Sequence, residues 1–162
     1  MQELLLWLEA AAVSTWVRES GSVWAYPTVL AAHTVGMSLL VGASAALDLR
    51  LLGVAPQVPL GPLAVLFRVL WTGAGLSLVS GLLLFGADAS TKGATPVFLV
   101  KLAFIAAALV VARRLRRTIY RGGSDAVAVP FAAKALAVAS LLLWAGAIAA
   151  GRFMAYLTPG PA

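Results

Sequence analysis

Four apolar stretches, each long enough to cross a lipid bilayer, constrain this 162-residue chain more than any other feature. About 20 helical residues span a hydrocarbon core roughly 30 Å thick. The stretches run over about residues 26–49, 62–87, 96–112 and 131–157. Helix is expected because a helix satisfies its own backbone hydrogen bonds in lipid, whereas an open strand edge does not. We therefore predict an all-α fold: one integral membrane domain over residues 1–162, built as a four-helix bundle.

The composition agrees with a membrane protein. The chain is 62% hydrophobic and only 11% charged, whereas roughly a quarter of a soluble domain is charged. The net charge is +6, but five of the twelve Lys and Arg residues fall in one cluster. This basic character predicts membrane topology and contact with anionic lipid headgroups, and it does not indicate nucleic-acid binding. The absence of cysteine excludes disulfides and thiolate chemistry.

The basic cluster predicts the orientation of the chain. It consists of Arg113, Arg114, Arg116, Arg117 and Arg121. Short loops rich in Lys and Arg stay on the cytoplasmic side of a membrane. We therefore expect the loop over about residues 113–130 and the loop 53–61 to be cytoplasmic, and both chain termini to be external.

The segment over about residues 4–18 is apolar but too short to span a membrane. Glu9 interrupts it, and Trp7, Ser14 and Arg18 share one helical face. We predict an N-terminal interfacial helix that lies on the membrane or against the bundle. A fifth, tilted span is the alternative.

The second apolar stretch carries a stripe of small residues. Gly73, Ser77 and Gly81 recur at every fourth position. Such a stripe lets another helix approach closely, so we interpret it as a packing surface rather than as a ligand groove. Trp71 and Trp144 are expected to pack inside the bundle.

Ionisable residues from four parts of the chain are predicted to meet in the outer half of the bundle. They are His33, Asp88, Lys101 and Arg152. The sole histidine lies roughly 10 Å below the external surface, at 1.5 Å per residue. Charged groups inside membranes usually face the bundle interior, a cavity or a partner. The plainer interpretation is that Lys101 and Arg152 extend to the interface, and that His33 is neutral and bonded to Ser, Thr or a backbone carbonyl.

A second polar cluster is predicted at the cytoplasmic ends of the first two spans. It contains Asp48, Arg50 and Arg68. We expect Asp48 to form an ion pair with Arg68 or Arg50 that closes this end. Asp48 and Arg50 are two residues apart and do not face each other on a helix.

A haem or metal site at His33 is the sharpest alternative. Imidazole is a good iron or copper ligand, four-helix bundles house haem between facing helices, and Lys101 and Arg152 lie at a depth suited to haem propionates. One histidine supplies one axial ligand, so a second ligand requires a homodimer, Met37 or Met154. A transport accessory role, holding an anion or relaying protons, is a third hypothesis. Four short spans without broken helices offer little machinery for independent transport.

No catalytic motif is evident in the sequence. A Ser-His-Asp arrangement, a phosphate-binding loop, an HExxH motif and a carboxylate pair within one span are all missing. We therefore expect a protein that is not an enzyme.

Several short motifs occur in order along nearly the whole chain. They are Tyr26-Pro27 with His33 and Gly36, residues 47–53, residues 81–85 with Asp88, Phe98 with Lys101, residues 140–144, and Gly151-Arg152 with Ala155-Tyr156. In these motifs the chain resembles a family of small four-span bacterial inner-membrane proteins known only as a domain of unknown function. The resemblance implies a bacterial cytoplasmic-membrane location and no particular activity. It also implies a polar or histidine residue near the cytoplasmic end of the third span, where this chain has Ala108 to Arg113. This departure from the family pattern weakens a two-histidine haem site within one subunit.

The sequence thus predicts a non-enzymatic membrane subunit or binding module whose outer-half cluster engages a ligand or partner. The expected partners are the lipid bilayer and another membrane protein or a second copy of the chain. A haem- or metal-binding redox protein is the alternative.

Overall fold

Four long helices dominate the structure. The computed structural model describes residues 2–20, 22, 24–93, 95–120 and 129–157. In chain order the helices are α1 (Gln2–Glu9), α2 (Ala12–Glu19), α3 (Tyr26–Leu51), α4 (Ala64–Gly86), α5 (Ala89–Gly93), α6 (Pro96–Tyr120) and α7 (Phe131–Leu157). No strand occurs in the described ranges, and α3, α4, α6 and α7 are long and apolar enough to cross a membrane. The prediction of an all-α bundle with four spans is confirmed.

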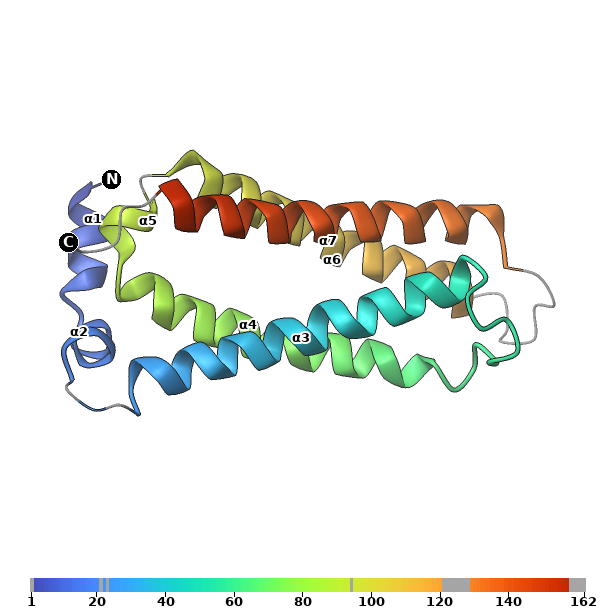
Figure 1. The fold of residues 1–162 in the computed structure, drawn as a ribbon, viewed down its shortest axis with the longest axis horizontal. Helices are drawn as coiled ribbons and strands as arrows, with labels where there is room; N and C mark the ends of the chain where they lie inside the picture. The colour runs from blue at the N-terminus through green and yellow to red at the C-terminus, as the bar shows by residue number, and fades with distance from the viewer. Residues whose placement is uncertain (1, 21, 23, 94, 121–128, 158–162) are drawn as a thin grey trace.

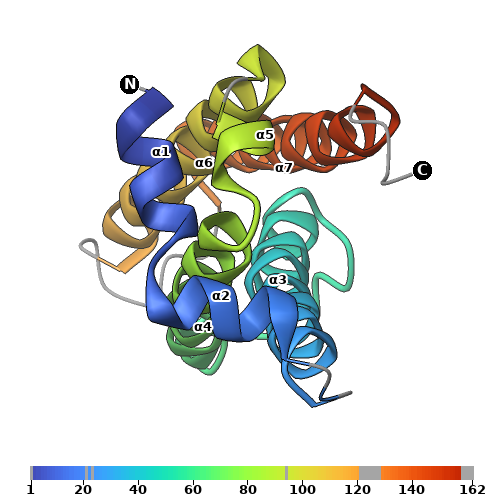
Figure 2. The same cartoon turned by 90° about the vertical axis from the view of Figure 1, so that its left-hand side faces the viewer.

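The long helices form two antiparallel pairs (Figure 1). α3 packs along α4, α6 packs along α7, and the pairs meet chiefly through α3 and α7. The pairs lie close together at one end, the basic end, and diverge toward the other, the cap end, where α1, α2 and α5 lie across the bundle (Figures 1 and 2). The basic end carries Arg50, Arg68, Arg113, Arg114, Arg116 and Arg117, near the ends of α3, α4 and α6.

Prolines determine where three of the long helices begin. Pro27 is the second residue of α3, Pro96 is the first residue of α6, and Pro130 immediately precedes α7. Proline suits the first turn because the backbone N–H that it lacks has no intrahelical partner there. These helices therefore begin at the residues predicted, and α4 begins at Ala64, two residues after its predicted start.

The first two long helices cross at a direct backbone contact. An added Cβ on Gly73 would lie 2.6 Å from the Leu40 nitrogen and 2.7 Å from the Gly36 carbonyl oxygen. One on Gly36 would lie 2.8 Å from the Ser77 nitrogen. At Gly36 and Gly73 only a residue without a side chain permits this approach. The stripe of small residues that includes Gly73 and Ser77 is therefore a packing surface, as predicted.

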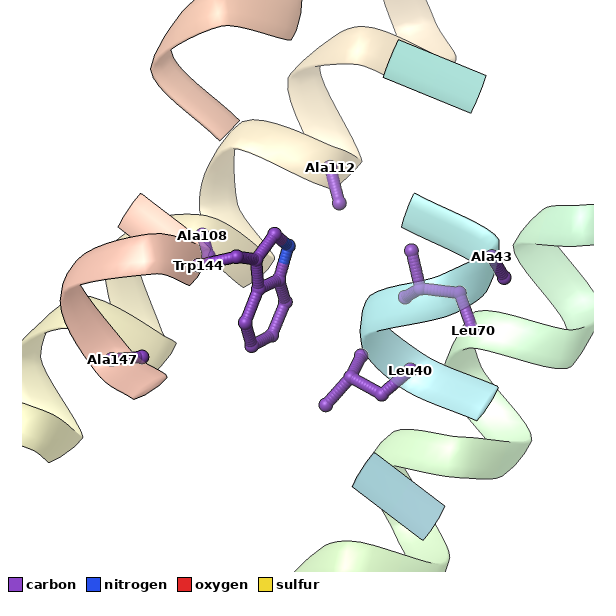
Figure 3. Packing of buried hydrophobic residues seen from close by; sticks show 7 residues of the cluster. All are labelled: Leu40, Ala43, Leu70, Ala108, Ala112, Trp144 and Ala147. Carbon is purple, nitrogen blue, oxygen red and sulfur yellow. The ribbon is translucent and has the colours of Figure 1, made fainter. Parts of the chain in front are cut away.

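A tryptophan joins the two helix pairs in the core. Trp144 of α7 is 2% exposed, and its ring projects between α6 and α3 (Figure 3). It packs with small and branched residues from all four long helices: Leu40, Ala43, Leu70, Ala108, Ala112 and Ala147. Large apolar side chains on the outer surface, such as Leu78, Leu82 and Leu142, are more than 60% exposed, as expected for lipid-facing residues.

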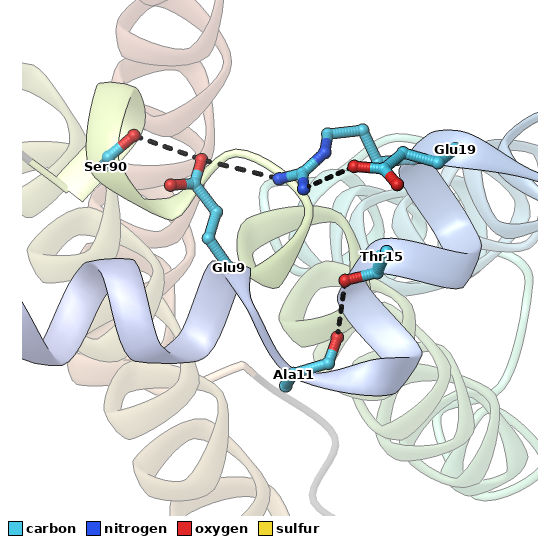
Figure 4. A network of polar contacts seen from close by, with 6 residues as sticks. Glu9, Ala11, Thr15, Glu19 and Ser90 are labelled. Atoms are coloured by element: carbon cyan, nitrogen blue, oxygen red, sulfur yellow. Dashed lines mark hydrogen bonds and ion pairs between the residues drawn. The ribbon is translucent and has the colours of Figure 1, made fainter.

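The N-terminal region differs from the prediction. It forms two eight-residue helices, α1 and α2, instead of one helix over 4–18. The chain turns at Ala10 and Ala11, where the Glu9 carboxylate accepts a hydrogen bond from Ser90 of α5 at 3.0 Å and lies 4.0 Å from Arg18 (Figure 4). Each helix is only about 12 Å long, so neither is a fifth span. Exposed Trp7 and Trp16 fit an interfacial position.

The third span also differs, because α6 continues through Tyr120 rather than ending near residue 112. Arg113, Arg114, Arg116 and Arg117 therefore lie on a helix and not in the predicted loop 113–130. Arginine is among the better helix formers, so nothing in this stretch stops the helix. Arg121 lies outside the described residues.

We predict that Gly73→Ala separates α3 from α4. The new methyl group meets backbone atoms that cannot move aside, so it lowers the free energy of unfolding by about 1–3 kcal/mol. The measurement is unfolding of the detergent-solubilised protein followed by circular dichroism.

Gly75→Ala is the matched control, two residues along the same helix. A Cβ there meets nothing within 4 Å, and alanine favours helix by up to about 1 kcal/mol over glycine. Equal destabilisation by both substitutions would contradict the role of the contact.

Candidate functional site

His33 lies on the second turn of α3, near the cap end, and is half-buried against α4. Its Nδ1 is 3.1 Å from the Ser77 carbonyl oxygen and 3.1 Å from the Ser80 hydroxyl oxygen. The glycine stripe makes room for the ring, because a Cβ on Gly81 would lie 3.1 Å from His33 Cε1. The helix crossing thus positions the histidine.

These contacts assign the ring protons of His33. A carbonyl oxygen only accepts hydrogen bonds, so Nδ1 carries a proton and donates it to Ser77. The Ser80 hydroxyl donates its own proton to the Leu76 carbonyl at 2.6 Å and therefore accepts from Nδ1 as well. In the neutral ring Nε2 then carries a lone pair. The described residues give Nε2 no hydrogen-bond partner, so it can accept a hydrogen bond or bind a metal.

Lys101 approaches His33 from the other helix pair. It is half-buried on α6, and its side chain runs past α7, with Cε 3.7 Å and Nζ 3.8 Å from where a Gly151 Cβ would lie. The ammonium group is close enough to interact electrostatically with His33. His33 and Lys101 thus belong to different helix pairs, α3 with α4 and α6 with α7, which diverge toward the cap end (Figure 1).

The other two residues of the predicted outer-half cluster also lie at the cap end. Asp88 is half-buried between α4 and α5, and Arg152 is exposed near the end of α7. The part that Asp88 and Arg152 take in a shared site stays a prediction.

The predicted ion pair at the basic end is wrong. Asp48 is fully buried and faces α7 rather than either arginine. Arg50 instead donates hydrogen bonds to the carbonyl groups of Val58 at 2.6 Å and Pro56 at 2.7 Å. Arg68 is exposed on α4. The arginine therefore secures the connection between α3 and α4, and the carboxyl group belongs to the core.

Around Asp48 lies a buried polar network that the sequence analysis missed. Ser44 accepts a hydrogen bond from Trp144 Nε1 at 2.9 Å and lies 3.4 Å from Asp48 Oδ2 and 3.1 Å from the Ser140 hydroxyl. Asp48 Oδ1 has no hydrogen-bond partner among the described residues. The spacing of these residues could have indicated the network, because each pair lies one helical turn apart on its helix: Ser44 with Asp48, and Ser140 with Trp144.

The described residues contain no group of three or more His, Asp or Glu side chains arranged to hold a metal ion. His33 is therefore a lone candidate ligand. Met37, one turn away, packs against the core cluster around Trp144.

Comparisons with known proteins give no match to any family model, curated protein or solved structure. The family resemblance of the sequence therefore stays a hypothesis.

We predict that ¹⁵N NMR of histidine-labelled protein shows His33 with its proton on Nδ1. The chain has one histidine, so both ring nitrogen signals belong to His33, and their couplings to the ring carbon-bound protons distinguish Nδ1 from Nε2. Ser80→Ala keeps the Ser77 carbonyl acceptor and should preserve this tautomer. A spectrum with the proton on Nε2 would contradict the assignment.

We also predict that Ser44→Ala lowers the free energy of unfolding by about 1–3 kcal/mol, because it leaves the buried Trp144 N–H without its acceptor. In a Trp144→Phe background the same substitution should cost less, which a double-mutant cycle of detergent unfolding measures. The control is Ser38→Ala on the same helix, where an exposed hydroxyl donates only to the Thr34 carbonyl. Equal costs of Ser44→Ala in both backgrounds would show that Trp144 does not depend on Ser44.

Proposed function

We propose that this protein is a non-enzymatic membrane binding module that holds an acidic group of a ligand or partner subunit at its cap end. The observation that carries the proposal is the bond from His33 Nδ1 to the Ser77 carbonyl. That bond leaves Nε2 as an acceptor on one helix pair, and the Lys101 ammonium of the other pair interacts electrostatically with the ring.

The chemistry of these two groups suits a carboxylic acid or an acidic hydroxyl. Such a group donates its proton toward Nε2 and accepts a hydrogen bond from Lys101. Hydrogen bonds of this kind, with one charged partner, contribute about 1.5–3 kcal/mol. The low dielectric of a membrane bundle strengthens the attraction to the ammonium.

We place the protein in a bacterial cytoplasmic membrane, with the basic end in the cytoplasm. Support comes from the arginines gathered at that end, since segments rich in Lys and Arg near spans stay inside. Both chain termini and the site at His33 are then external. The partner is a lipid-soluble acid, another membrane protein or a second copy of the chain.

A haem-binding redox protein is the second candidate, because metal-binding histidines typically donate their other ring N–H to a carbonyl or carboxylate. His33 has this arrangement. Lys101 disfavours a bare metal cation beside His33, whereas it suits a haem propionate. The chain supplies one imidazole, so the second axial ligand has to come from methionine or from another chain.

The test uses lauric acid, a lipid-soluble carboxylic acid, as the probe. Titration into detergent-solubilised protein should shift the His33 ring ¹⁵N signals, and Lys101→Gln should weaken the apparent affinity about tenfold or more. Lys134→Gln removes the same charge from an exposed position on α7 at the basic end and should leave binding unchanged.

The absorption spectrum of the gently purified protein separates the two candidates. A Soret band that His33→Ala abolishes would establish haem binding and replace the leading proposal. A colourless preparation whose His33 ring signals do not change when lauric acid is added would contradict both the acid-binding and the haem-binding proposals.

A further inference from the structure

A groove runs between α4 and α6 at the basic end, far from His33. α4 packs mainly on α3, and α6 packs mainly on α7. Between α4 and α6 the contacts are therefore made by side chains. The Arg113 guanidinium lies 4.8 Å from the centre of the Trp71 ring. The rings of Phe67 and Tyr120 meet edge to face at 5.9 Å. The aromatic side chains thus form the inner wall of a surface that arginines border.

Two adjoining cavities of about 510 and 580 Å³ occupy this α4–α6 groove. The first is lined by Trp71, Arg113, Arg116, Arg117 and Tyr120. The second is lined by Ala64, Phe67, Arg68, Trp71, Thr72 and Arg116. Trp71 and Arg116 belong to both linings, so the cavities share a wall.

The charge of the groove has one sign. Four arginines line it, three from α6 and Arg68 from α4, and no acidic residue does. Within the part of the chain that the structure describes, no groove arginine forms an ion pair with a carboxylate. The groove arginines therefore have no carboxylate partner there, and all four are exposed.

The groove also has an apolar side that continues into the lipid-facing surface of α4. Ala64 and Phe67 line it, and the neighbouring Val65 is 45% exposed. Arg68 lies four residues beyond the start of α4, or about 6 Å along the helix. The groove is therefore at the depth where headgroups meet acyl chains.

We propose that the α4–α6 groove binds the phosphate of an anionic phospholipid, with the acyl chains along α4. The guanidinium fork matches phosphate oxygens in two parallel hydrogen bonds. Basic pockets between membrane helices on the cytoplasmic side favour anionic headgroups. A zwitterionic lipid such as phosphatidylcholine places a positively charged headgroup among four arginines and is disfavoured.

The helix offers a matched pair of substitutions. Arg116 lines both cavities, whereas Arg114, also exposed, lines neither. Each change to Gln removes one positive charge from the same stretch of α6. If lipid binding reflects only the general attraction of anionic lipids to positive charge, both substitutions weaken it equally. If the lipid binds in the groove, only Arg116→Gln weakens binding.

The experiment measures retained phosphatidylglycerol by native mass spectrometry, using protein from mixed phosphatidylglycerol and phosphatidylcholine bilayers. We expect wild-type protein to retain phosphatidylglycerol and Arg116→Gln to reduce retention about tenfold or more. Arg114→Gln should retain it as wild type does. Thr72→Trp, which fills the second cavity without a change in charge, should also reduce retention.

Circular dichroism of each variant checks the fold, and exposed positions should tolerate these substitutions. Equal losses in Arg116→Gln and Arg114→Gln would overturn the proposal in favour of diffuse surface charge. Retention of phosphatidylcholine at the same level would overturn it too, as would displacement by millimolar inorganic phosphate, because the site would then recognise a free anion. None of these outcomes involves His33, so the binding module proposed at the cap end is tested separately.

Discussion

The contact between the backbones of α3 and α4 at Gly36 and Gly73 is the constraint on which the rest of the structure depends. It brings the helices so close that His33, one turn before Gly36, reaches a carbonyl and a hydroxyl on α4. A wider crossing would leave the imidazole without these partners, and its proton could then lie on either nitrogen. The chemistry proposed for the cap end is therefore a consequence of how two helices pack.

The arrangement of the long helices in two pairs gives the two ends of the molecule different properties. At the cap end the pairs diverge, and ionisable residues from different pairs come near each other without forming a dense core. Trp144 joins the pairs at the middle of the bundle. At the basic end the pairs converge on a second core cluster that includes Leu51, Leu115 and Ala137. Charge at this end is directed outward from the helices, apart from Asp48. One end thus suits recognition of a polar group, and the other suits the membrane boundary.

The sequence predicted the long helices well because bilayer-length apolar runs and prolines at first turns are local signals. The glycine stripe was equally readable, since its spacing alone indicates close packing. The direction of individual side chains could not be predicted in this way. Asp48 and Arg50 both lie near the end of α3, yet Asp48 faces the core and Arg50 binds carbonyl groups of the following loop. Glu9, at the break between α1 and α2, accepts a hydrogen bond from Ser90, which lies far along the chain. The partnership of His33 with Ser77 required knowing which face of α3 meets α4.

The length of the spans has a consequence for the membrane that the protein can occupy. α3, α6 and α7 contain 26, 25 and 27 residues, or about 37–40 Å of helix, against a hydrocarbon core of roughly 30 Å. The excess must be accommodated by tilt or by projection into the headgroups. With arginines at one end and helices laid across the other, the molecule is held from both sides. A change in bilayer thickness is therefore expected to alter the tilt of the helix pairs.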